Sequence, residues 1–135
     1  MPKYSCQIIN KFEKGMLLFP HIDSENIGEA MLYVNNVNNG KAYLTTCISF
    51  GTNHKFDDIV VDNHIPIWLR IGYVETTVEK CDLEIIEVSN RLFNSARILM
   101  ERSDCKYCNS DIFDNVVNGE LRERDVVGMA REISE

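Results

Sequence analysis

The stretch TTVEKCDLEIIEVSNRLFNSARILMER, residues 76–102, decides the fold of this 135-residue chain. Its apolar residues recur at alternating steps of three and four, the spacing that lines one face of a helix: Val78, Cys81, Ile85, Val88, Leu92, Ala96 and Leu99. Thr76 is placed to cap such a helix, with Glu79 reaching back in a capping box. The spacing predicts one long helix near 76–102, whose apolar face must be covered by a sheet or by a second copy of the chain.

The same stretch supports a second interpretation. From Cys81 to Ile85 apolar and polar residues alternate, as they do in a half-buried strand, and Ile86 and Val88 continue this pattern after a bulge. In that case the protein is a β-rich, barrel-like domain with residues 80–88 as a strand and helices at the C-terminal end. Both interpretations stay open on the sequence alone.

Residues 25–37 present a similar choice. Helical spacing, with Ser24 as a cap and Gly40 as a stop, predicts a helix over this range, with its apolar face formed by Ile27, Ala30, Met31, Val34 and Val37. The competing interpretation has two strands, 30–34 and 43–48, with the asparagine-rich segment between them as a turn.

The remaining segments complete an α+β fold in a single domain, residues 1–135. β-Branched and aromatic residues predict strands, and a periodic charged segment predicts a closing helix at 120–134. The expected architecture is a small, mostly antiparallel sheet with a helix near 25–37, a long helix near 76–102 and a C-terminal helix. The expected strands are 4–9 and 16–19, joined as a hairpin around Gly15, then 41–50 and 65–74. Residues 58–61 form a brief strand or a connection, and residues 111–117 form a short helix or strand.

Composition limits the classes of partner. The net charge is −7 and the basic residues are scattered among acidic ones, so nucleic-acid binding would need a local basic patch that the sequence does not show. No apolar run approaches the roughly 20 residues of a membrane span. The five irregularly spaced cysteines favour a reducing, cytoplasmic setting. A viral or phage protein in the host cytoplasm fits the same features.

Cys105 and Cys108 form the one compact motif with chemical potential. Two thiols separated by two residues can share a zinc ion, or they can form a redox pair at the start of a helix. A structural zinc site needs four ligands, and no second pair of this kind occurs, so Cys6, Cys47, Cys81 or a histidine would have to complete it.

The remaining candidates are a set of histidines and a set of interface-type residues. His21, His54 and His64 lie in loop-like contexts beside polar residues, and no hydrolase, zinc-protease, P-loop or dinucleotide motif accompanies them. Trp68, Arg70 and Tyr73 are of the types that dominate interfaces, although packing in the core accounts for Trp68 as well.

The sequence therefore favours a non-enzymatic protein-interaction module, such as an adaptor, an inhibitor or an immunity-type accessory protein. It would bind an unidentified protein partner and form a homodimer through the long helix. The alternatives are a zinc-binding or redox protein centred on Cys105 and Cys108, and a nucleic-acid-binding accessory protein.

Overall fold

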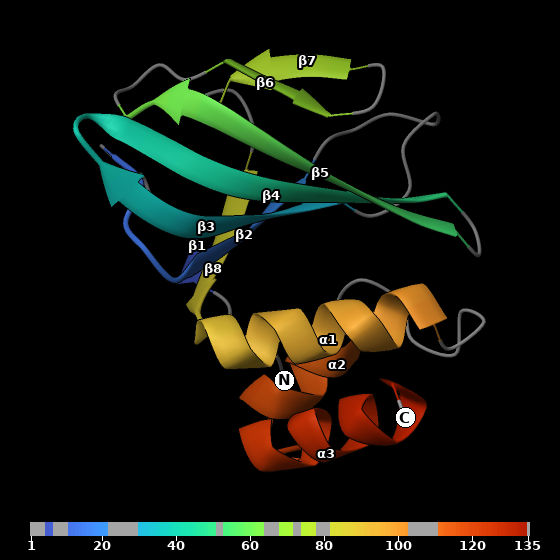
Figure 1. Cartoon of the computed structure of the whole chain (residues 1–135). Helices are drawn as coiled ribbons and strands as arrows, with labels where there is room; N and C mark the ends of the chain where they lie inside the picture. Colours follow the sequence, from blue (N-terminus) through green and yellow to red (C-terminus); the bar gives the residue numbers. More distant parts are fainter. Residues whose placement is uncertain are drawn as a thin grey trace.

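A computed structural model describes residues 5–6, 11–21, 30–50, 53–63, 68–71, 74–77, 82–102 and 111–134 (Figure 1). The strands are β1 (Ser5–Cys6), β2 (Met16–His21), β3 (Ala30–Asn38), β4 (Lys41–Phe50), β5 (Asn53–Asp62), β6 (Trp68–Ile71), β7 (Val74–Thr77) and β8 (Asp82–Glu87). The helices are α1 (Asn90–Arg102), α2 (Asp111–Val117) and α3 (Glu123–Ser134). The predicted α+β class, with a mostly antiparallel sheet and a C-terminal helix, is confirmed.

Six of the strands form one open sheet in the order β1-β8-β2-β3-β4-β5. Every pairing between neighbours in this sheet is antiparallel. Strands β6 and β7 pair only with each other among the residues described, as a separate two-stranded ribbon. The two ends of the sheet are β1 and β5, and no pairing joins them among the residues described. The sheet is therefore open, and the barrel of the alternative interpretation is wrong. That interpretation is right that a strand, β8, lies within 80–88 and that helices follow at the C-terminal end.

The sheet lies between two layers (Figure 1). The three helices cover one face, and the β6–β7 ribbon lies on the opposite side. Side chains alternate between the two faces along each strand. On the helical side, Met31 and Tyr33 of β3 join Cys47 and the apolar residues of the helices in one buried cluster. On the other side, the buried apolar residues described are Phe12, Leu18, Leu32, Val34, Ala42, Leu44 and Ile85.

Contacts between aromatic rings hold the helical layer on the sheet. The rings of Tyr33 and Phe93 stack with centroids 4.1 Å apart, and Phe19 meets Phe113 edge to face at 6.1 Å. The Tyr33 hydroxyl donates a hydrogen bond to Asn90 Oδ1 at 2.6 Å, at the first residue of α1. Burial raises the pKa of Tyr33, so this hydroxyl stays protonated and able to donate.

The long helix predicted over 76–102 is wrong in its first half. Residues 74–77 and 82–87 are strands, and the helix begins only at Asn90. The true cap is Ser89, whose hydroxyl accepts a hydrogen bond from the Leu92 N–H at 3.0 Å and donates to Glu123 of α3. The apolar residues that follow Ser89 line the buried face of α1, and α3 and the sheet cover that face. The proposed dimer through a continuous helix therefore loses its structural basis.

The helix predicted over 25–37 is also wrong, because its described part belongs to β3. The competing interpretation, two strands joined by an asparagine-rich turn, is confirmed. Asn39 and Gly40 both have positive φ, 53° and 72°, as a type I′ hairpin turn requires. Leu32 and Val34 are buried on one face of β3, and Met31 and Tyr33 are buried on the other. The sequence of β3 is therefore a continuous apolar run, and such a run also contains the spacing of an amphipathic helix.

The expected strand over 65–74 is interrupted. In the described part, Trp68–Ile71 forms β6, and the chain turns back at Val74, which begins β7 and pairs with Ile71. The expected hairpin between 4–9 and 16–19 is wrong as well, because β8 lies between β1 and β2 and pairs with both.

Gly15 lies where the chain enters β2. Its N–H donates to the Val34 carbonyl and its carbonyl accepts from the Val88 N–H, both at 2.9 Å, so it bridges two strands. Its φ is +91°, and a Cβ at this position would lie 3.3 Å from the Val88 carbonyl oxygen. Both the backbone conformation and this close approach require glycine.

Candidate interaction surface

Strand β5 forms the long outer edge of the sheet. Its ten residues pair with β4 in a continuous register, with no bulge and no proline. The Asn63 N–H donates to the Gly40 carbonyl at 2.9 Å, which fixes the odd-numbered residues of β5 as those whose backbone groups face β4. The backbone N–H and C=O groups of Phe56, Asp58 and Val60 therefore point outward. No strand in the described part of the chain pairs with them.

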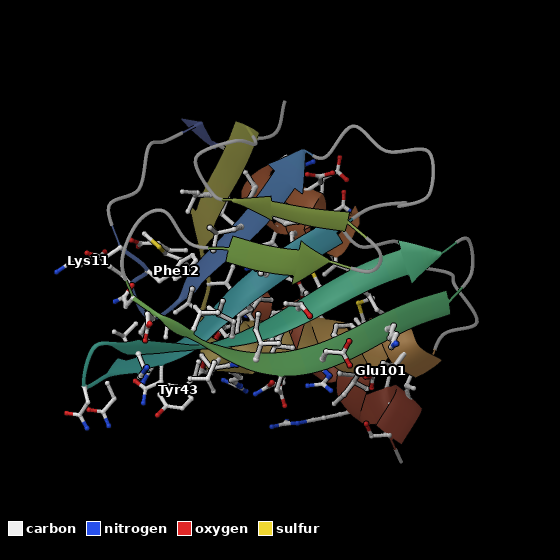
Figure 2. The ribbon with its side chains drawn as sticks, turned by 90° about the horizontal axis from the view of Figure 1, so that it is seen from above. Lys11, Phe12, Tyr43 and Glu101 are labelled. Atoms are coloured by element: carbon white, nitrogen blue, oxygen red, sulfur yellow. The ribbon has the colours of Figure 1, made fainter. Side chains whose placement is uncertain are left out.

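One pair of exposed apolar side chains accompanies this edge. Val60 of β5 is directly opposite Tyr43 of β4, and their side chains share the face that carries the helices. Val60 is 56% exposed and Tyr43 is 40% exposed, whereas most large apolar residues described on this face are buried. In Figure 2, Tyr43 lies toward the end of the sheet that carries the β3–β4 turn, away from Glu101 near the end of α1.

Polar contacts from the neighbouring strands and from α1 hold β5 in place. Asn35 Nδ2 donates to Thr45 Oγ1 at 2.8 Å, and this hydroxyl donates to Asp58 Oδ1 at 2.7 Å. Asn35 lies at the irregularity where the pairing of β3 with β4 shifts, which aims its amide toward β4. The guanidinium of Arg97 in α1 lies over the Phe56 ring, 4.8 Å from its centroid. These contacts hold β5 against β4 and α1.

A salt bridge closes the end of the β4–β5 ladder. Lys41 Nζ contacts Asp62 Oδ1, and both side chains are about half exposed. The hydrogen bond to the Asp62 carboxylate raises the pKa of Lys41. Exposed pairs of this kind contribute only about 0–1 kcal/mol to the free energy of unfolding. The bridge therefore adds little stability, and it matches the register in which Lys41 pairs with Asp62.

The described part of the chain contains only some of the residues singled out from the sequence. Trp68 and Arg70 lie on β6, while Tyr73 lies outside the described residues. Cys105 and Cys108 also lie outside them, so the zinc or redox alternative stays a prediction. His21 is on β2 and His54 on β5, with two strands between them, and His64 falls outside the described ranges.

The described part of the chain holds no metal cluster, and the Cys47 thiol is not activated. No group of three His, Cys, Asp or Glu residues there could hold a metal ion. Cys47 is buried in the core beneath α1. Burial raises the pKa of its thiol to about 12, and the negative charge of Glu101 acts in the same direction. A thiol that stays protonated is a poor nucleophile, so Cys47 is a packing residue.

The Cys47 thiol predicts a loss of stability in alkali. Below its ordinary pKa of 9.0 the thiol is protonated in the folded and unfolded chains alike. Above that value only the unfolded chain releases the proton, so the free energy of unfolding falls by up to about 1.4 kcal/mol per pH unit until about pH 12. Urea denaturation at about pH 8 and about pH 10.5 should show a smaller decline in a Cys47→Ala variant. An equal decline in both proteins would contradict this prediction.

Comparisons with protein-family models, with curated proteins and with solved structures found no match. No helix in the described ranges is long and apolar enough to cross a membrane. The geometry of the β5 edge is the basis for the function proposed below. The sequence predicted only a brief strand or a connection at 58–61 and did not indicate this edge, although Asn39-Gly40 is a strong hairpin signal that places β3 and β4 correctly.

Proposed function

We propose that this protein is a non-enzymatic protein-interaction module that binds an extended segment of its partner by strand addition at β5. The observation that carries the proposal is the ten-residue edge strand whose outward backbone groups have no strand partner in the described structure. Main-chain hydrogen bonds supply affinity in this mode of recognition, and side chains along the edge supply specificity.

The regularity of β5 supports this proposal. Native sheets protect their edges with short strands, prolines, bulges or charged side chains. Of these devices, β5 has the charged side chains of Lys55, Asp57 and Asp58, but no proline and no bulge over its ten residues. Exposed Asp57 and Asp58 give β5 a charge pattern that selects among partners, because like charges facing each other across a strand pair are unfavourable.

The Tyr43–Val60 pair extends the binding surface beyond the backbone. An added strand along β5 would lie next to Val60 and cover part of its exposed side chain. Burial of apolar area contributes about 25 cal/mol per Å², so this pair adds to the main-chain hydrogen bonds. Tyrosine is a residue type enriched at interface hot spots.

Replacing Asp58 with proline tests strand addition directly. Proline removes the outward N–H at this position, and the ladder to β4 keeps its hydrogen bonds because the backbone N–H and C=O of Asp58 point away from β4. We expect Asp58→Pro to abolish capture of the native partner, measured by affinity purification from the source cell. The control Asp58→Ala loses the same carboxylate but keeps the N–H, and it should retain capture.

A second measurement separates binding from folding. Thermal melts of both variants establish that the domain is intact. NMR-detected hydrogen exchange should then show that the amides of Phe56 and Asp58 exchange fast in the unbound protein and slowly in the complex. Equal capture by the proline and alanine variants, with both folded, would refute strand addition at this edge.

A further inference from the structure

The charges along β5 restrict how this edge can pair with itself. When two copies pair antiparallel about a two-fold axis perpendicular to the sheet, each residue keeps its side chain on the same face in both copies. Residues that are directly opposite must also share a face, so the axis passes through one residue that lies opposite itself in the second copy. Centres at Lys55, Asp57 or Asp58 place two identical charges opposite each other. A centre at Val60 places Asp58 opposite Asp62. These four registers are disfavoured, because like charges directly opposite are destabilising.

A register centred at Phe56 instead places opposite charges across from each other. Residues at equal distances before and after Phe56 face each other, so Lys55 of each copy lies opposite the partner subunit's Asp57. The two-fold symmetry produces this pair twice. Lys55 and Asp57 are both exposed and share the face of the sheet that carries the β6–β7 ribbon. The remaining register in the range 55–60 is centred at Ile59, and it avoids like charges without making any ion pair.

We propose that the segment added at β5 is β5 of a second copy of this chain, in the antiparallel register centred on Phe56. This inference rests on the proposed function and names the partner. Outward backbone groups of Phe56 and Asp58 form the hydrogen bonds of the pair, and the two six-stranded sheets become one continuous sheet. The two Lys55–Asp57 contacts fix the register.

Figure 2 shows β5 along one border of the sheet, with the β6–β7 ribbon above the sheet rather than beyond this border. The contact of Phe56 with Arg97 lies on the helical face, so the cation–π pair and the ladder between two β5 strands use different sides of the strand. The centre of the proposed dimer is therefore held in shape before association, which lowers the entropic cost of binding.

A charge-reversal cycle tests the register. Sedimentation equilibrium would compare the full chain with Lys55→Glu, Asp57→Lys and the double variant K55E/D57K. Each single change places like charges opposite each other twice, so we expect each to weaken the dimer by about tenfold or more. The double variant exchanges the two charges and should restore the dissociation constant to within about threefold of the original. Lys11→Glu, an exposed change with the same effect on net charge as Lys55→Glu, should leave the dimer unchanged.

Each contrary outcome has a distinct meaning. A dimer that is insensitive to both single reversals overturns the register centred on Phe56. A wild-type chain that stays monomeric at every concentration overturns the identification of the partner as a second copy. Such a monomer does not overturn strand addition itself, which fails only if a folded Asp58→Pro variant still captures its partner. Thermal melts of every variant confirm that the exposed substitutions leave the fold intact.

Discussion

Replacing Phe93 with alanine is expected to lower the free energy of unfolding by about 3–5 kcal/mol. Phe93 is 1% exposed, and its ring stacks on Tyr33 at 4.1 Å with an interplanar angle of 12°. The change leaves a cavity where α1 packs on the sheet and removes the aromatic contact. Since small domains have only about 5–15 kcal/mol of stability, the effect should be plain in urea denaturation and should lower the melting temperature by about 10–20 °C.

The neighbouring residue provides the control. Asn94 follows Phe93 on α1 and is exposed, so Asn94→Ala should change stability by no more than about 0.5 kcal/mol. The two substituted residues are neighbours on the same helix, but the side chain of Phe93 faces the core and that of Asn94 faces solvent. A loss below about 1 kcal/mol for Phe93→Ala would mean that the helical layer does not pack on the sheet through this ring.

Replacing Phe12 with alanine is expected to cost a similar amount, about 3–5 kcal/mol. Phe12 lies in the segment before β2, yet it is only 1% exposed. Its N–H donates to Asn63 Oδ1 at 2.6 Å, and Asn63 Nδ2 donates to the Phe12 carbonyl at 3.1 Å. This pair of hydrogen bonds fastens the segment to the residue that follows β5.

Lys11 serves as the control for Phe12. Figure 2 shows Lys11 pointing away from the molecule beside Phe12, and Lys11 is exposed. Lys11→Ala should leave the free energy of unfolding within about 0.5 kcal/mol of the original value. If Phe12→Ala were equally harmless, the face of the sheet opposite the helices would not depend on this side chain. Because Asn63 follows β5 directly, a destabilised Phe12 variant should also show faster hydrogen exchange at the end of β5.

The errors of the sequence analysis have a common physical origin. Strand β3 is buried on both faces and carries apolar residues on both sides, so it lacks the clean alternation of a half-exposed strand. In such a run, residues at steps of three and four can always be selected. Strand β8 does alternate as far as Ile85, but Ile85 and Val88 also fall at steps of three and four with Leu92 of α1. The residues of α1 then continue the apparent stripe after Ser89, and two elements merge into one pattern. The residue that separates the strand from the helix is Ser89. It directly precedes α1 and caps it, and a serine in this position is a recognisable helix-start signal.

The sequence by itself determined the α+β class, the strand at 41–50 and the C-terminal helix. Each of these carries a local signal, either β-branched residues in an uninterrupted run or amphipathic spacing with exposed charges. Only the tertiary structure decided that residues 82–87 are extended, because β1 and β2 offer hydrogen bonds to both edges of β8 that no helix could make there. It also decided the candidate surface. Being at the edge of a sheet is a consequence of strand order, which depends on which strands pair and not on the residues of β5 alone.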